Sequence, residues 1–207
     1  MALKRSHVPQ SAEPEPAPQL VSLPELIEQL AHADAGERRL AALALLNHQQ
    51  AAPLLIEHLK SEPSAVVREA VFTTLARLGE PAALTGLARC LSSEDANLRN
   101  GAIETLKLLP EQTATIIPRL LADSNSDVRI LTISILESLR HPFVEQWLVD
   151  VIESDPHLNV CGAALDLLVE VGGPESLGSI QRVKQRFIAE PYIQFAADLA
   201  MKRIKQG

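Results

Sequence analysis

Histidine, cysteine and the carboxylates, which carry most enzyme chemistry, occur here without the spacing of a catalytic or metal-binding motif. The chain contains no nucleophile elbow, no phosphate-binding loop, and no GxGxxG or CxxC sequence. Its histidines are scattered and lack the i, i+4 spacing of a helical metal pair. They are His7, His32, His48, His58, His141 and His157. We therefore expect no catalytic residue, no metal site and no cofactor.

The two cysteines indicate a reducing compartment. Cys90 and Cys161 lie far apart, each inside an apolar run that is typical of a helix. Such residues are usually reduced core thiols of a cytosolic protein. The N-terminus lacks the apolar segment of a secretory signal, and no apolar run approaches the length of a membrane span. We expect a cytoplasmic protein without a membrane partner.

The charge pattern argues against a nucleic-acid partner. The net charge is −7, whereas a nucleic-acid binder needs a basic surface to displace phosphate counterions. Residues 141–173 contain six acids and no Lys or Arg, and residues 174–207 contain six bases and three acids. This contrast is typical of an ordinary solvated face with a basic end, and equally of a dipolar docking surface.

An internal repeat is the strongest feature of the sequence. Segments around Val67, Leu98, Val128 and Val160 superpose with steps of 31, 30 and 32 residues, and weaker copies have their reference positions at Arg38 and Ile193. Eight positions after each reference residue, the column is almost entirely Leu. It consists of Leu46, Leu75, Leu106, Leu136, Leu168 and Met201. Three positions after each reference residue, most side chains are small.

These offsets trace one face of a helix, and each such helix follows a shorter helical segment. Two-helix units of this length cannot bury both faces alone, so they must stack. We predict an all-α, right-handed solenoid of about six helical hairpins over residues 22–207. Ser22 and Glu25 predict the first helix start. Residues 1–21, rich in Pro and Glu, are expected to be a disordered tail.

These repeats resemble the HEAT-like superfamily, specifically its short bacterial type named after phycobilin-lyase-associated proteins. The best copy is Pro118-Arg-Leu-Leu-Ala-Asp123 followed by Asp127-Val-Arg129, which is similar to the family's pattern of Pro early in the first helix, Asp in the turn and Val-Arg opening the second helix. The resemblance covers roughly residues 22–205 and implies a fold rather than a function, because the superfamily includes scaffolds, transport receptors and a few enzymes.

One arginine column follows the reference positions. It contains Arg39, Arg68, Arg99 and Arg129, and it continues with Cys161 and Gln194. An anion site is one interpretation. We favour a structural ladder, because in HEAT arrays the similar Arg pairs with turn carboxylates of its own or the adjacent repeat. Asp34, Glu62, Asp95, Asp123 and Asp127 are candidates here. Because the ladder stops at Cys161, repeats five and six are predicted to lack this contact.

Two enzyme types of this fold are disfavoured by the residues present. Iron-dependent hydroxylases of the fold resemble arrays with repeated His-Glu pairs, and no His-Glu dipeptide occurs here. Base-excising glycosylases need a basic, aromatic-lined groove, and only 3% of this chain is aromatic. We therefore predict a non-catalytic protein.

The predicted binding surface is the concave side, which the second helices of such arrays usually line. Glu104, Glu137, Asp166 and Glu170 are expected to share an acidic patch there, with apolar footing from Leu108, Ile130 and Val169. This mixture suits a basic or amphipathic protein segment. The leading hypothesis is a protein-binding scaffold or adaptor. The alternatives are an accessory lyase or chaperone-like subunit of a tetrapyrrole protein, suggested by the family name, and a nucleic-acid-processing enzyme.

Overall fold

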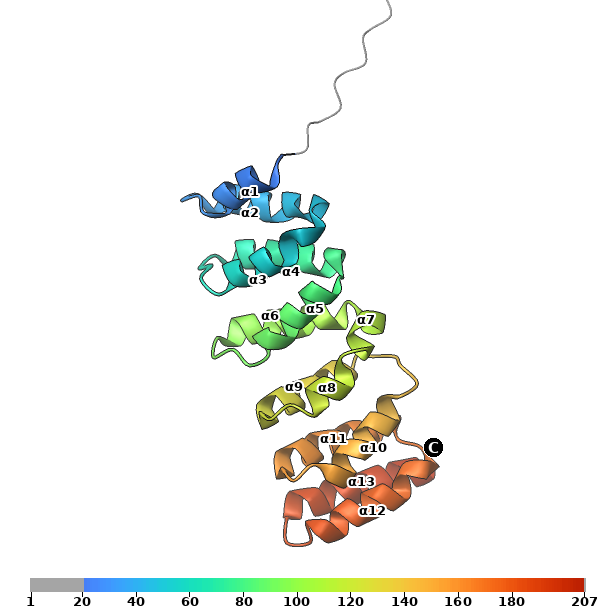
Figure 1. Ribbon diagram of the computed structural model, residues 1–207. Helices are drawn as coiled ribbons and strands as arrows, with labels where there is room; N and C mark the ends of the chain where they lie inside the picture. The colour runs from blue at the N-terminus through green and yellow to red at the C-terminus, as the bar shows by residue number, and fades with distance from the viewer. Residues whose placement is uncertain (1–20, 207) are drawn as a thin grey trace, which may run out of the picture.

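The computed structural model describes residues 21–206, and every regular element in this range is a helix. The predicted all-α solenoid is confirmed: six helical hairpins stack one on another (Figure 1). Residues 1–20, most of the expected tail, lie outside the described residues.

Each hairpin has a first and a second helix, and in the fourth hairpin the first helix is split in two. The hairpins, in order, are α1 (Leu23–Leu30) with α2 (Ala35–Ala44), α3 (Ala52–Leu59) with α4 (Ala65–Leu78), α5 (Pro81–Cys90) with α6 (Ala96–Lys107), α7 (Pro110–Ala114) and α8 (Ile117–Leu121) with α9 (Ser126–Leu136), α10 (Val144–Ser154) with α11 (Leu158–Val171), and α12 (Leu177–Arg186) with α13 (Pro191–Gln206). Short 3₁₀ turns at Leu45–Asn47, Gln49–Ala51 and Pro174–Ser176 connect some of them.

The first helix begins where the sequence predicts. The backbone N–H of Ser22 donates to Glu25 Oε2 at 3.0 Å, and Pro24 lies in the first turn, where its missing N–H leaves no bond unmade. At the other end of a helix, Gly79 follows α4 with φ of 57°, the left-handed conformation that glycine adopts without strain.

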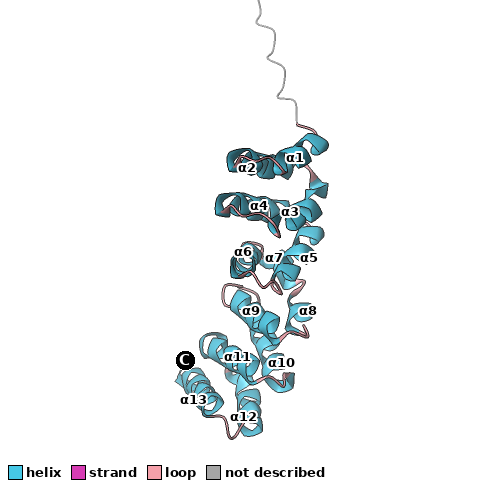
Figure 2. Ribbon diagram, turned by 90° about the vertical axis from the view of Figure 1, so that its left-hand side faces the viewer, coloured by secondary structure: helices cyan, strands magenta, loops and turns pink. Residues whose placement is uncertain are grey.

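The helices form two layers. Second helices lie on one side of the array and first helices on the other, and the array bends toward the second-helix side at its C-terminal end (Figure 2). Apolar side chains from both layers form a continuous core from Leu26 to Ala200. Small residues allow close approach between repeats: a Cβ on Gly101 would meet the ring of Phe72 at 2.1 Å. Each hairpin therefore depends on its neighbours for burial.

In the first repeat the structure differs from the predicted register by one residue. Leu45 is fully buried, whereas Leu46, which was assigned to that column, is only half-buried. The same shift puts Arg38 at the arginine position and leaves Arg39 exposed. Arg38 lies three residues after the first residue of α2, as Arg68, Arg99 and Arg129 do in their helices, so the displaced column arises because two arginines are adjacent here.

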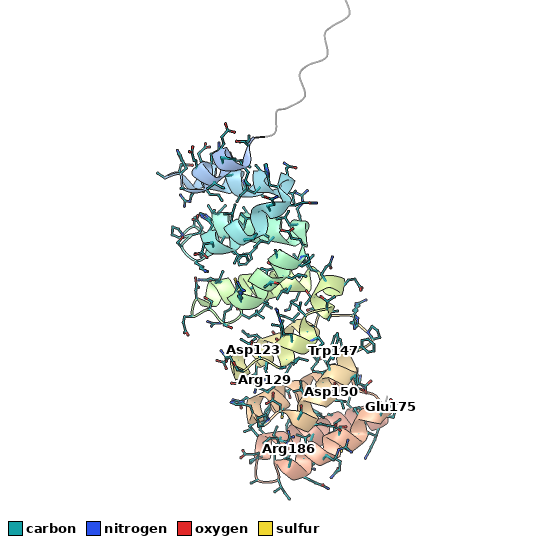
Figure 3. All side chains as sticks on the ribbon, viewed as in Figure 1. Asp123, Arg129, Trp147, Asp150, Glu175 and Arg186 are labelled. Atoms are coloured by element: carbon teal, nitrogen blue, oxygen red, sulfur yellow. The ribbon has the colours of Figure 1, made fainter. Side chains whose placement is uncertain are left out.

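The arginine of each of the first four repeats closes its own hairpin turn. Its Nη1 donates to the backbone carbonyls six and five residues earlier, at 2.7–3.4 Å. The pairs are Arg38 with His32 and Ala33, Arg68 with Glu62 and Pro63, Arg99 with Ser93 and Glu94, and Arg129 with Asp123 and Ser124. Figure 3 shows Asp123 and Arg129 together at one such turn. The ladder is thus built mainly on carbonyl oxygens.

Two of these arginines also reach a carboxylate of the next repeat. Arg38 binds both carboxylate oxygens of Glu62 at 2.8 Å, and Arg129 binds those of Asp155 at 2.6 and 3.0 Å. Both acids are buried. Arg68 and Arg99 donate to no carboxylate among the described residues, so the expected pairing of every arginine with a turn acid is wrong for these two.

In repeat five, the turn carbonyls are bound mainly by a side chain from the next repeat. Cys161 occupies the arginine position, and its thiol donates to the carbonyl of Asp155 at 3.3 Å. The guanidinium of Arg186, from α12, donates to the carbonyls of Ile152, Glu153 and Asp155 at 2.5–2.9 Å. In repeat six the amide of Gln194 binds the carbonyls of Lys184 and Phe187. Repeats five and six therefore lack the pair between a column arginine and a turn carboxylate, as predicted, although other side chains close their turns.

The buried acid Glu62 predicts acid-sensitive stability. The hydrogen bond from Arg38 lowers the pKa of Glu62 from 4.5 to about 2, against the opposing effect of burial, with smaller help from Ser64 and His58. Because the folded pKa is depressed, this contribution is complete above pH 4.5 and is lost as the pH falls toward 2. Glu62→Gln should cost roughly 3 kcal/mol at neutral pH and progressively less in acid. Urea unfolding at several pH values measures the difference, with the exposed Glu57→Gln as control. A pH-independent difference would contradict the assignment.

Replacing Arg186 should loosen repeat five. Arg186→Ala removes the guanidinium donor from three turn carbonyls, of which only that of Asp155 keeps another side-chain donor, the Cys161 thiol; the expected loss is about 1–3 kcal/mol. Amide hydrogen exchange over residues 152–161 should accelerate relative to the intact protein. The control is Arg182→Ala, which removes an exposed guanidinium of the same helix that pairs with Glu153. Equal exchange in the two variants would show that Arg186 does not hold this turn.

Candidate protein-binding groove

A groove between α9 and α11 opens on the second-helix side. It encloses about 280 Å³ and is called here the α9–α11 groove. Its walls combine aliphatic and acidic side chains from both helices. The lining residues are Ile130, Ile133, Ser134, Glu137, Ala163, Asp166, Leu167 and Glu170.

Three of the four predicted acids meet in this groove. Glu137 directly follows α9 as its C-cap residue, and Asp166 and Glu170 come from successive turns of α11; all three side chains are exposed. Within residues 21–206, none of them forms an ion pair with a Lys, Arg or His. The groove therefore presents three carboxylates whose charge no cation of the described chain neutralises.

Glu104 lies elsewhere, which corrects the expectation of a single patch of four acids. It lines a second hollow of about 360 Å³ between α4 and α6, together with Leu108. Its carboxylate pairs with Lys107 at 3.1 Å. Glu104 belongs to α6 of repeat three, which packs beside α9, but it does not line the groove. Its negative charge is also partly offset.

The apolar residues beside the acids are only partly those that the sequence predicts. Ile130 lines the groove and Leu108 lines the neighbouring hollow with 71% of its surface exposed. Val169 is half-buried against the core and does not line the groove. Ile133 and Leu167 form its floor instead.

Tyr192 of α13 is the residue at this site that the sequence analysis missed. Its hydroxyl donates to Asp166 Oδ2, and its ring covers Gly162, where a Cβ would meet it at 2.4 Å. Partial burial, and then the hydrogen bond to Asp166 and the charge of that carboxylate, raise the pKa of Tyr192 to about 12. The small residue at Gly162, one repeat earlier, was the available signal, because a close inter-repeat approach needs a partner side chain.

Other surface features of the described residues differ from this groove in their charge and chemistry. A larger hollow of about 770 Å³ lies between α3 and α5 on the first-helix side, and its charged lining residues are Glu57, Lys60 and Arg89. Trp147 stacks on His141 on the same side of the array, with ring centroids 5.0 Å apart. Within residues 21–206 no group of three His, Cys, Asp or Glu residues is placed to hold a metal ion. No described helix is long and apolar enough to cross a membrane.

Comparison with known proteins agrees with the fold. The family model of HEAT repeats matches residues 23–107, the first three hairpins, so the predicted resemblance to HEAT-like repeats is confirmed. No curated protein matches the sequence.

Several solved structures are similar to this chain. The archaeal HEAT-like repeats protein from Thermococcus onnurineus has 17% identity and a TM-score of 0.43, with 87% of this chain and 86% of that chain covered. The CpcE–CpcF complex of phycocyanin lyase from Nostoc has 20% identity and a TM-score of 0.36, over 94% and 99%. A designed armadillo repeat protein in complex with the peptide (KR)4 has 17% identity and a TM-score of 0.44, over 89% and 100%.

The bond between Tyr192 and Asp166 can be tested by titration. Tyr192 is the sole tyrosine, so the absorbance change of phenolate formation reports on this side chain alone. The intact protein should titrate near pH 12, and Asp166→Asn should shift the midpoint toward the ordinary value of 10, because the acceptor loses its charge. Glu170→Gln, in the same groove, should leave it unchanged. A midpoint near 10 in the intact protein would contradict the contact.

Proposed function

We propose that this chain is a non-catalytic protein-binding scaffold or adaptor whose α9–α11 groove holds a basic or amphipathic segment of a partner protein. The observation that carries the proposal is the trio Glu137, Asp166 and Glu170 above an aliphatic floor, without a neutralising cation among the described residues. Charge complementarity of this kind sets the encounter rate and partner choice, while buried apolar anchors supply most of the affinity.

The chemistry of the groove disfavours the other partner classes. Clustered carboxylates repel phosphates, so a nucleic acid gains no counterion-release energy here. Among the described residues at the groove, neither hydroxyl is an activated nucleophile: that of Ser134 donates to the carbonyl of Leu131, and the pKa of Tyr192 is raised to about 12. The proposal includes a cytoplasmic location, supported by the free thiols of Cys90 and Cys161.

Charge reversal in the groove tests the function. The probe is a fluorescent amphipathic helix of Lys and Leu, with a Glu and Leu peptide as the matched acidic probe. The basic probe should bind and the acidic probe should not, and binding should weaken as salt rises. Asp166→Lys with Glu170→Lys should slow association about tenfold without unfolding the array, because exposed substitutions usually cost little stability.

The control pair is Glu28→Lys with Glu111→Lys, which makes the same charge change at exposed positions on first helices. It should retain most of the association rate, since net charge alone has a smaller effect than local charge. Equal slowing by both pairs would mean that the probe responds to net charge only. Unchanged binding by the groove variant would exclude the groove as the site.

A further inference from the structure

α13 follows the groove along the array and carries basic residues on the second-helix side, where the groove carries acidic ones. α13 packs directly beside α11, on the second-helix side of the array (Figure 2). The buried residues Ile193, Ala197 and Ala200 of α13 occupy the register of Val160, Ala164 and Leu167 in α11. In this register, the positions of Asp166 and Glu170 in α11 are taken in α13 by Leu199 and Arg203.

The exposed face of α13 is both apolar and basic. Tyr192, Phe195 and Leu199 follow the i, i+3, i+7 spacing of one helical face, and they are 47%, 67% and 41% exposed. Lys202 and Arg203 continue this face by one turn and are exposed, and neither forms an ion pair with another described residue. The one acid of the helix, Asp198, already pairs with Lys184. This helix therefore has the features expected of a segment that binds the α9–α11 groove.

An acidic groove and a basic amphipathic helix on one face make that face complementary to itself. We propose that the second-helix side of repeats four to six is a homodimer interface, in which the groove of one copy receives α13 of a second copy and the reverse contact forms at the same time. A twofold axis satisfies both contacts, and such an interface closes after two copies. This inference rests on the proposed function, because it names a second copy of this chain as a partner of the same groove.

As in the proposed function, apolar side chains supply contact area and charged side chains set the orientation of the partner. Phe195 and Leu199 supply apolar area that no described residue covers, and the Ile133 and Leu167 floor of the groove receives it. Glu137 and Glu170 of one copy face Lys202 and Arg203 of the other, which fixes the antiparallel orientation. A parallel arrangement would bring like charges together and is disfavoured.

Sedimentation velocity of the full chain tests the interface without any peptide. A dimer is expected at micromolar concentration in about 50 mM salt, and its dissociation constant should rise at least about tenfold at 500 mM. Glu137→Lys with Glu170→Lys should weaken the dimer, and so should Lys202→Glu with Arg203→Glu. The control Glu28→Lys with Glu111→Lys should remain dimeric, and circular dichroism establishes that each variant is folded.

Mixing the two charge-reversed proteins gives the decisive result. Each alone repels itself at both contacts, whereas the mixture pairs a basic groove with an acidic helix and a native groove with a native helix. A heterodimer in the mixture, with dissociation close to that of the native dimer, supports the proposal. A chain that stays monomeric in low salt, a dimer unaffected by the variants, or open-ended oligomers would each overturn it. A monomer that still binds the basic peptide would overturn this inference and leave the proposed function standing.

Discussion

The closure of each hairpin turn by a side-chain donor, a guanidinium in the first five repeats, is the interaction on which the rest of the array depends. Turns of this length leave carbonyl oxygens at the end of the first helix without intrahelical partners, and these must be satisfied because the turn is packed against the next repeat. Arginine reaches two carbonyls with one nitrogen and keeps its other nitrogens for the next repeat, as Arg129 does with Asp155. Lysine lacks this planar fork and has no equivalent reach. In Arg38 and Arg129, the same side chain thus fixes the hairpin and the stacking of its neighbour.

Repeat five shows that the turn carbonyls need a side-chain donor even where the arginine column holds no arginine. Where Cys161 replaces arginine, Arg186 reaches the same turn from the following repeat, and its guanidinium also lies 3.2 Å from the Cys161 sulfur (Figure 3). The substitution therefore couples repeat six to repeat five more closely. The contact joins α12 to the turn before α11, and α13 packs against both α11 and α12.

The repeat columns were sufficient to predict the fold, because burial recurs with a period that the chain cannot satisfy in any other way. Helix bounds such as those of α3 and α8 were also predictable from the apolar pattern and the prolines. The shift from Arg39 to Arg38 was not predictable, because two adjacent arginines fit the column equally well in the sequence. The site was predicted in part. Glu137, Asp166 and Glu170 share a groove, but Tyr192 and Arg186 act across repeats, and their contacts depend on inter-repeat geometry.

The carboxylates that stabilise the fold differ from those proposed to bind a partner. Glu62 and Asp155 are buried and bound to arginine, so their removal affects folding, whereas the groove carboxylates are exposed and form no ion pair within residues 21–206. Asp166 is the exception, because it accepts a hydrogen bond from Tyr192 of the next repeat. A cation that binds Asp166 must either share its carboxylate with the phenol or displace it. The Tyr192 ring also covers Gly162, so displacement of the phenol would move the start of α13. Binding in the groove would then change the position of the C-terminal repeat.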